Sequence, residues 1–301
     1  MAPSSTWFTA SPEWGWLIVA WFFFGGLAAG CYLLAALIDL FGRPEDRPLA
    51  RAGYFAVLPC LILSGIVLIV DLHRPERFWH MLLENHTLHP MFKYWSPMSI
   101  GSWVLLALSF FALLSFLGAL SESGRLSWSG ARRLRPPGAI GTAVAVIGGL
   151  LGLWLAGYTG VLLAVTNRPI WADTPLIGML LVLSAASIAA AFMILLAYRY
   201  RWRGAGTAAL QRIDDWVIML ELIVLVAVVV SLGAAARAWL NAWGLLLVLG
   251  PVVLGMLLPL LLSRRRTWLG ARTPVAAAVL VILGGLLLRI VIVFSSEAIH
   301  L

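Results

Sequence analysis

The densest group of side chains that could exchange protons or bind a metal lies between positions 71 and 97. Four of the five histidines of the chain fall there, namely His73, His80, His86 and His89. A metal site built from His80, His86 and His89 is one interpretation, because zinc accepts histidine and carboxylate ligands. We favour a loop that docks a partner protein or lines the mouth of a pocket, since a segment so rich in charge, aromatic rings and histidine suits a protein interface.

Four ionisable side chains fall inside long apolar stretches, where a charge is costly and is therefore a candidate for function. They are Asp214, the adjacent Asp215, Glu221 and Arg289. Asp214 and Glu221 are seven residues apart, which places them on roughly the same face of a helix. A proton relay is one interpretation, and a buried Glu–Arg pair that only fixes helix packing is the other. The different depths of Glu221 and Arg289 argue against a direct contact, and both interpretations stay open.

Tyr158 lies between Gly157 and Gly160 near the end of another apolar stretch. A phenol at that depth can donate a hydrogen bond to a quinone carbonyl. A lone tyrosine in such a place is more often an ordinary residue of the membrane–water interface. The same level of the membrane is expected to hold Asp71, His73 and Ser99.

Redox metals are not expected in this chain. Its two cysteines, Cys31 and Cys60, are scattered, whereas an iron–sulfur cluster needs about four thiolates. A haem inside a helix bundle needs axial ligands, usually histidines, within the helices, and none of the five histidines lies in an apolar stretch. We therefore expect no haem, no iron–sulfur cluster and no other metal, so that any electrons must be exchanged with another protein.

The elements that position these residues are expected to be membrane-spanning helices. Of 301 residues, 62% are hydrophobic and 11% charged, against about 25% charged in an ordinary soluble domain. This composition excludes a soluble enzyme and a disordered chain, and the dispersed arginines argue against nucleic-acid binding. Continuous apolar stretches predict helices rather than the short alternating strands of a membrane barrel. We expect a single domain over 1–301 with eight spans, at about 14–38, 52–70, 98–120, 138–164, 174–198, 213–236, 241–262 and 274–294.

The distribution of basic residues predicts which ends of the helices face the cytoplasm. Fifteen of the 21 lysines and arginines lie in or beside the connections after the first, third, fifth and seventh spans, five lie in the other connections, and Arg289 lies within the last span. The positive-inside rule therefore places both termini and the loop at 71–97 outside. The pairs Gly26/Gly30 and Gly148/Gly152 predict close helix packing. The expected fold class is an all-α integral membrane protein of two four-helix bundles.

Four segments together resemble the NrfD/PsrC-like polysulfide reductase membrane-subunit family. Residues 71–78, with the sequence DLHRPERF, are similar to the DLxRPxRF signature of that family. Residues 26–30 (GLAAG), 96–103 (SPMSIGSW) and 158–163 (YTGVLL) agree with it in order and spacing. The expected eight spans fit the whole chain.

The resemblance implies a quinone-binding membrane subunit of a respiratory oxidoreductase complex in the bacterial cytoplasmic (inner) membrane. Such subunits bind a quinone, typically menaquinone, near the outer face and oxidise or reduce it there. They exchange its electrons with an iron–sulfur partner of the four-cluster, ferredoxin-like type, to which a molybdopterin catalytic subunit is joined. Proton movement across the membrane is a further expectation. Apart from these subunits on the outer face, only membrane lipid is expected as a partner, and no nucleic acid.

The resemblance also implies roles for single residues. Tyr158 looks like the quinone-pocket tyrosine of the family, and Glu221 looks like the membrane acid proposed for proton passage. Some relatives carry polar side chains, including histidine, in the outer half of the first span, where this protein has residues 17–21 (LIVAW). The second carbonyl partner is therefore expected to be His73, Asp71 or a water. The expected sets are Tyr158, Asp71, His73, Ser99 and Trp21 for the quinone, Arg74, Arg77, His80 and Lys93 for docking, and Glu221, Asp214 and Arg289 for protons.

A secondary transporter and a pure membrane anchor without a quinone site are the alternatives. Eight helices and charges within the membrane suit a transporter loosely. Against it, no span shows a convincing break at the midplane, and Pro251 and Pro259 in the seventh span are the nearest candidates. A transporter should purify alone, whereas both other classes bring partners, and quinone binding separates those two.

Overall fold

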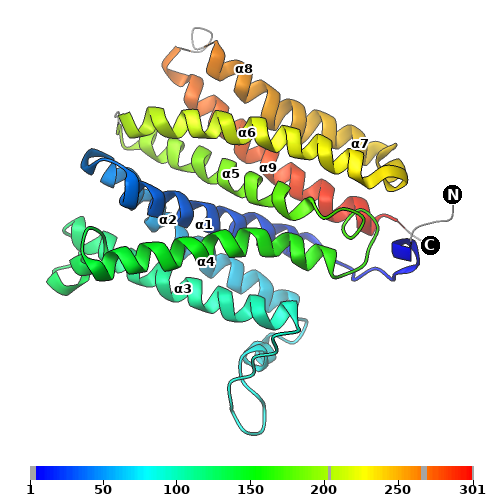
Figure 1. Ribbon diagram of the computed structural model, residues 1–301, viewed down its shortest axis with the longest axis horizontal. Coiled ribbons are helices and arrows are strands. Elements are labelled where there is room, and N and C mark those ends of the chain that lie inside the picture. The colour runs from blue at the N-terminus through cyan, green and yellow to red at the C-terminus, as the bar shows by residue number, and fades with distance from the viewer. Residues whose placement is uncertain (1–4, 203–204, 266–269, 300–301) are drawn as a thin grey trace.

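Eight long apolar helices lie side by side in the computed structural model, which describes residues 5–202, 205–265 and 270–299 (Figure 1). Seven are continuous α-helices, and the remaining one, the seventh span, changes its hydrogen-bonding pattern in the middle. That span runs through α7 (Ala242–Leu247), a π-helical segment (Val248–Leu257) and α8 (Leu258–Arg264). The others are α1 (Trp16–Phe41), α2 (Arg47–Asp71), α3 (Pro97–Glu122), α4 (Ala139–Ala164), α5 (Ile177–Arg199), α6 (Ala205–Leu232) and α9 (Thr273–Glu297).

The helices begin close to the predicted positions, with two exceptions at the basic end of the molecule. The helix α2 begins at Arg47 rather than near 52, and α6 begins at Ala205 rather than near 213. Arg51 in α2 and Arg212 in α6 interrupt the apolar stretch, but backbone hydrogen bonds continue the helix regardless of side-chain polarity. Hydropathy therefore underestimates a helix that extends beyond the membrane.

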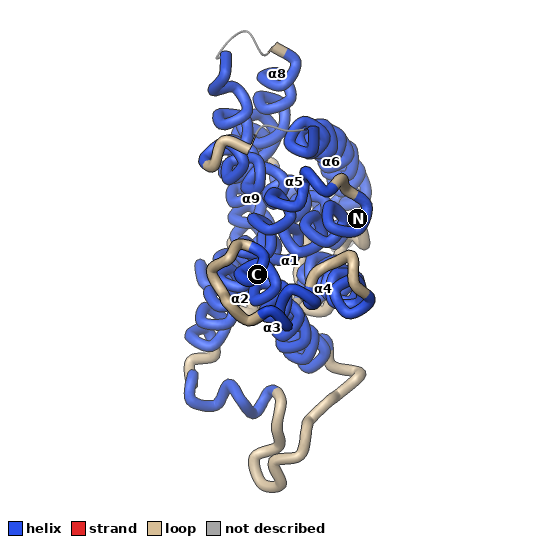
Figure 2. Tube along the Cα trace, turned by 90° about the vertical axis from the view of Figure 1, so that its left-hand side faces the viewer, coloured by secondary structure: helices blue, strands red, loops and turns tan. Residues whose placement is uncertain are grey.

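The helices form two bundles, as the sequence predicts. In the first, α1, α2, α3 and α4 each contact the next, and α4 closes on α1. In the second, α5 packs on α6 and α9, and the seventh span packs between α6 and α9 (Figures 1 and 2). The bundles meet where α1 and α4 contact α5 and where α1 touches α9. The predicted fold class, an all-helical protein with eight candidate spans, is confirmed.

Small residues allow the helices to approach this closely. A β-carbon at Gly30 in α1 would overlap the carbonyl oxygen of Ala185 in α5, and one at Gly152 in α4 would lie 2.9 Å from the Ala29 carbonyl oxygen. Close backbone contact between spans is what such glycines provide in membrane helices. The predicted packing role of the glycine pairs is therefore confirmed at Gly30 and Gly152.

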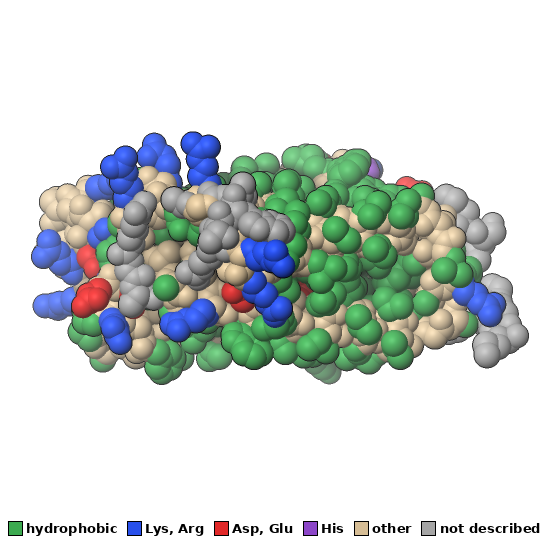
Figure 3. All heavy atoms as spheres, turned by 90° about the horizontal axis from the view of Figure 1, so that it is seen from above, with side chains coloured by type: hydrophobic (Ala, Val, Ile, Leu, Met, Phe, Trp, Pro, Cys, Tyr) green, Lys and Arg blue, Asp and Glu red, His purple; other side chains and the backbone are tan. Residues whose placement is uncertain are grey.

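Both termini lie at the same end of the molecule, and the basic side chains gather at the opposite end (Figures 1 and 3). We call the terminal end the outer end and the basic end the inner end, following the positive-inside expectation. Two of the arginines counted for that expectation, Arg203 and Arg266, lie outside the described residues. At the outer end, buried Arg168 donates hydrogen bonds to the carbonyl oxygens of Thr9, Ser296 and Ile299, which ties both terminal segments to the bundle.

Substitution of Gly30 tests whether the two bundles depend on this close approach. Gly30→Ala should lower the free energy of unfolding by about 1–3 kcal/mol, because the added methyl group meets rigid backbone of α5. The matched control is Gly65→Ala in α2, where a β-carbon meets no atom within 4 Å. Unfolding of the purified protein in one detergent measures both. Equal stability of the two variants would contradict the packing argument.

Candidate functional site

Tyr158 lies in the outer half of α4 among aromatic rings from the first bundle. Its side chain is buried, with 6% of its surface exposed. The phenol stacks on Trp154 at a centroid distance of 5.0 Å and meets Trp21 of α1 edge-on at 6.4 Å. Among the residues that the structure describes, none forms a hydrogen bond with the Tyr158 hydroxyl. The ring is thus held by packing while its polar atom is left available.

Gly101 in the first turns of α3 makes the room that Tyr158 occupies. A β-carbon at Gly101 would overlap the Cζ and Oη atoms of Tyr158. The segments at 96–103 and 158–163, which both carry the family resemblance, therefore meet in space. Ser99, also in the first of these segments, is buried, and its hydroxyl accepts a hydrogen bond from the backbone N–H of Lys93 at 3.1 Å. Ser99 fixes the end of the outer loop against α3.

Two more polar atoms, one of Trp21 and one of a residue in α2, lie close to Gly25 of α1. Within the described part of the protein, the indole Nε1 of Trp21 and the hydroxyl of Ser64 in α2 are buried and have no hydrogen-bond partner. They lie 3.6 and 3.7 Å from the position that a β-carbon of Gly25 would take. The absence of a side chain at Gly25 therefore leaves both polar atoms facing one small region. A buried polar group without a partner is costly, and a ligand or water is the usual explanation.

Sequence reasoning missed Ser64. The available signal was a hydroxyl residue inside an apolar stretch, seven residues and thus about two turns before Asp71. Serines in membrane helices usually bond back to the preceding turn, so that signal alone does not separate a site from a satisfied helix residue. Only the missing partner in the folded protein makes Ser64 a candidate.

The outer loop does not lie against this cluster. It begins at Asp71, the half-buried last residue of α2, includes a short 3-10 helix (Pro75–Met81), and extends beyond α2 and α3, away from the second bundle (Figures 1 and 2). Among the described residues, no hydrogen bond, ion pair or ring contact joins its charged side chains to Tyr158. The expected docking residues Arg74, Arg77 and Lys93 are exposed, as is His73, and the His80 ring is hydrogen-bonded to Asn85 at 3.1 Å.

A second polar cluster lies inside the other bundle, around Arg289 of α9. Its guanidinium is 1% exposed and reaches the first bundle, where Nε donates to the Phe22 carbonyl oxygen at 3.0 Å. Nη1 donates to the Gly285 carbonyl oxygen at 2.7 Å and to the Ser184 hydroxyl at 3.1 Å. Arg289 is thus bonded to the residue next to Trp21, and it forms a polar link between the bundles.

Ser184 also connects Arg289 to Glu221. The buried Glu221 carboxylate interacts with the Ser184 hydroxyl and attracts Arg289 electrostatically. In the described part of the protein, however, no direct ion pair joins Glu221 to Arg289. Ser184 was not identified from the sequence, because a serine in an apolar helix does not reveal which neighbours it faces.

Asp214 continues this line of polar groups toward the inner end. It is buried and accepts a hydrogen bond from the Ser187 hydroxyl at 3.0 Å. Ser187 and Ser184 are three residues apart on α5, and both line one small cavity with Glu221. On its other side, Asp214 borders a cavity of about 40 Å³ lined by Gln211 and Asp215 among others. That volume is enough for at least one water molecule.

The π-helical segment of the seventh span borders the Glu221 cavity. Pro251 and Gly255 line that cavity, and Gly255 approaches Gly284 of α9 so closely that a β-carbon on either would meet the backbone of the other. Pro251 lacks an N–H and interrupts the α-helical pattern, and single π-helical segments often occur at functional sites. The span is not broken at the midplane, but its regular hydrogen bonding changes next to Glu221.

Comparisons with known proteins identify one family. The sequence pattern of the family described as "Polysulphide reductase, NrfD" matches residues 8–299. A polysulfide reductase chain of Wolinella succinogenes is 27% identical over 274 residues, which cover 83% of this protein and 82% of that one. Protein NrfD of Escherichia coli is 27% identical over 326 residues, covering 99% of each protein. A selenate reductase subunit of Mesobacillus selenatarsenatis is 32% identical over 95 residues, covering 32% of this protein and 20% of that one.

A double-mutant cycle tests the contact between Gly101 and Tyr158. Gly101→Ala should lower the free energy of unfolding by about 1–3 kcal/mol in the wild-type background. The loss should fall to less than about half of that value in a Tyr158→Ala background, where the obstructing ring is gone. Gly157→Ala is the control, because a β-carbon there finds its nearest atom at an ordinary 3.6 Å. The same loss in both backgrounds would show that Gly101 serves another contact.

Proposed function

The chain belongs to the NrfD polysulphide reductase family, and we propose that it is the quinol-binding membrane subunit of a respiratory reductase complex in the bacterial cytoplasmic membrane. The observation that carries the proposal is a group of three polar atoms in the outer half of the first bundle that have no hydrogen-bond partner among the described residues. They are Tyr158 Oη, Trp21 Nε1 and Ser64 Oγ. Relatives are named as single chains or subunits of reductases, which supports partner subunits for this protein as well.

The chemistry of these donors suits the oxygens of a quinone head group. The Tyr158 hydroxyl and the Trp21 indole can donate to a quinone oxygen, and the Ser64 hydroxyl can donate or accept. The flat rings of Trp21 and Trp154 beside Tyr158 suit an aromatic ligand, which supports a fused-ring quinone such as menaquinone. A bound quinol supplies two electrons and two protons.

Tyr158 and the residues nearer the outer end have separate roles in this proposal. Tyr158 Oη orients one oxygen of the head group, and Trp21 Nε1 or Ser64 Oγ orients the other. Asp71 lies about two turns above Ser64 on α2 and close to His73, so its carboxylate and the His73 imidazole can exchange protons with the outer solution. The exposed residues Arg74, Arg77 and Lys93, with His80, receive an iron–sulfur partner, which is joined to a molybdopterin catalytic subunit.

Removal of one hydroxyl tests the quinol site. Tyr158→Phe keeps the ring that packs on Trp154 and Gly101 but removes the donor, so quinol-driven reduction of the partner's clusters should fall about tenfold or more. Assembly should be unchanged. The assay is menaquinol-driven reduction of the iron–sulfur clusters in the intact purified complex, which does not require the terminal substrate. The control is Tyr200→Phe at the inner end, where the side chain is 58% exposed.

Two results would count against this site. Unchanged quinol turnover in Tyr158→Phe would show that the Tyr158 hydroxyl is not part of the quinol site. A wild-type complex that holds its partners but neither binds nor oxidises quinol would reduce the protein to an anchor.

The polar line through the second bundle supports a path for protons between the inner end and the quinol site. Asp214 borders the inner cavity, Ser187 and Ser184 connect it to Glu221, and Arg289 reaches from there to Phe22, next to Trp21. Asp214 and Glu221 can hold a proton at a carboxylate oxygen, whereas the two serines and Arg289 orient hydrogen bonds. The irregular backbone at Pro251 borders the same small cavity as Glu221.

Replacement of Glu221 by its amide separates a proton path from a packing role. Glu221→Gln keeps the size and hydrogen bonding of the side chain but cannot carry a proton, so proton uptake from the inner side per electron should fall about tenfold. Quinol binding should persist. A pH indicator trapped in vesicles containing the complex measures uptake, and Glu45→Gln, an exposed inner-end residue, is the control. Unchanged uptake with altered stability would assign Glu221 to packing.

A further inference from the structure

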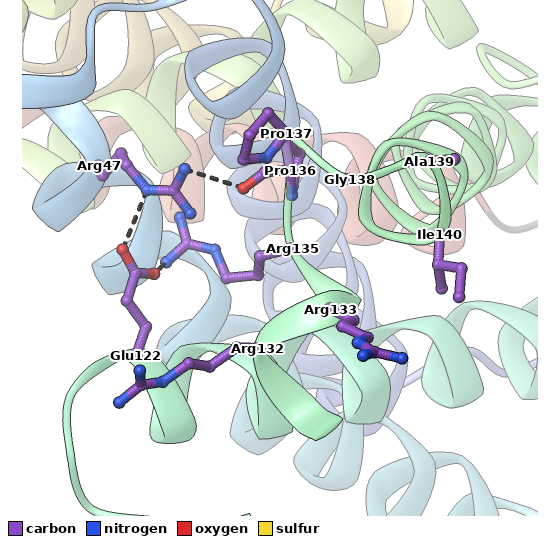
Figure 4. Close-up of a pocket in the computed structure, with 10 residues that line it drawn as sticks. All are labelled: Arg47, Glu122, Arg132, Arg133, Arg135, Pro136, Pro137, Gly138, Ala139 and Ile140. Carbon is purple, nitrogen blue, oxygen red and sulfur yellow. Dashed lines mark hydrogen bonds and ion pairs between the residues drawn. The ribbon is translucent and has the colours of Figure 1, made fainter. Parts of the chain in front are cut away.

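A cavity of about 610 Å³ opens at the inner end of the first bundle, between the ends of α2, α3 and α4 (Figure 4). Four arginines line it, and Glu122 is the acidic residue among its lining. The arginines are Arg47, Arg132, Arg133 and Arg135. This cavity lies at the opposite end of the bundle from Tyr158. We propose that it binds the phosphate head group of an anionic phospholipid.

Two of the four arginines are neutralised within the protein. Arg135 is 3% exposed and pairs with both carboxylate oxygens of Asp39, at 3.0 and 2.5 Å, and also contacts Glu122. Arg47 pairs with the other oxygen of Glu122 at 3.0 Å (Figure 4). This group of two arginines and two carboxylates carries no net charge, and it forms a fixed wall of the cavity.

Arg132 and Arg133 carry the remaining charge of the cavity. Both are exposed, and neither forms an ion pair with any residue that the structure describes. They lie in a short 3-10 helix (Ser129–Leu134) that leads into Arg135. In Figure 4 the Arg133 side chain extends toward the side of the cavity on which Ile140 lies. The cavity thus offers two unpaired positive charges, for which an anion is the complementary ligand.

Backbone donors at the start of α4 complement the same charge. The helix begins at Ala139, and its N-cap residue Gly138 provides no side chain to cap the first turn. Gly138, Ala139 and Ile140 line the cavity and are exposed. The free N–H groups of a long helix favour a phosphate at this position. Arginine guanidinium groups bind phosphate oxygens in the same way, through paired hydrogen bonds.

The apolar surroundings favour a lipid over a soluble phosphate. A stripe of exposed apolar residues runs from the edge of the cavity along the lipid-facing side of α4, through Ile140 (58% exposed), Ile147 (43%), Leu150 (62%) and Trp154 (39%). Their spacing of three, four or seven residues places them on one helix face. Trp128, 57% exposed, lies just before the 3-10 helix and is typical of the membrane–water interface. A lipid can therefore place its phosphate among the arginines and its acyl chains on α4.

Binding of phosphatidylglycerol to the purified full-length protein tests the proposal. Native mass spectrometry in detergent gives the affinity of the wild type, of Arg132→Ala/Arg133→Ala, and of the control Arg212→Ala/Arg264→Ala, which removes two exposed inner-end arginines from the second bundle. The first double variant should bind about 30-fold more weakly, because two surface charges near the phosphate are lost. The control should stay within about twofold of the wild type. Arg132→Lys/Arg133→Lys should keep most of the binding.

Further ligands separate the possible sources of the anion. Phosphatidylcholine should bind far more weakly than phosphatidylglycerol, and inorganic phosphate alone should not compete at equal concentration. Phosphatidylglycerol should also raise the thermal unfolding midpoint of the wild type but not of the Arg132→Ala/Arg133→Ala variant. Equal affinity of that variant and the wild type, an equal loss in the control, or phosphate binding as tight as the lipid would each overturn the proposal.

Discussion

A guanidinium in the apolar interior of a membrane protein has to find acceptors within the protein, because lipid offers none. Arg289 finds them in three helices, at the carbonyl oxygens of Phe22 and Gly285 and at the Ser184 hydroxyl. This geometry requires α1, α5 and α9 to approach closely. Gly26 lies where a β-carbon would come within 2.9 Å of the guanidinium, and Gly30 lies against the backbone of α5. Gly26 and Gly30 of the first span therefore serve the contact between the bundles.

The same interaction relates the two polar clusters. Arg289 is bonded to the residue next to Trp21 on one side and to the serine that reaches Glu221 on the other. A change of charge near Trp21 would alter the electrostatic energy of the Arg289 guanidinium and, through Ser184, that of the Glu221 carboxylate. Electrostatic interactions are strong where water is excluded. The proposed coupling of quinol chemistry to proton movement needs a connection of this kind. Other buried arginines hold the two ends of the molecule: Arg168 bonds to the terminal segments at the outer end, and Arg135 pairs with Asp39 at the inner end of the first bundle.

The sequence predicts those features that depend on averages over many residues. Eight spans, their order and the basic end follow from apolar stretches and from the distribution of arginines, and close packing follows from the glycine pairs. Tyr158 and Trp21, which the sequence analysis assigns to one expected site, come together in the first bundle. Ser64, Ser184 and Ser187 were not found, because a serine in an apolar helix gives no sign of the helix that it faces. The π-helical segment at Pro251 and the early start of α6 depend on backbone hydrogen bonding, which hydropathy does not report.

Buried polar groups without partners give the strongest physical reason to place a ligand beside Tyr158. Most buried polar side chains in the described part of the protein are bonded within it, as Trp171 is to the Ile292 carbonyl oxygen and Trp239 to Ser295. The buried atoms that lack a partner there are Trp21 Nε1, Ser64 Oγ and the Nε of Arg168, whose other guanidinium nitrogens are bonded. An unpaired buried group costs about 1–3 kcal/mol. Two such groups facing one region beside Gly25 are best explained by a ligand or water that completes their hydrogen bonds. The adjacent Tyr158 hydroxyl adds a third donor for the same ligand.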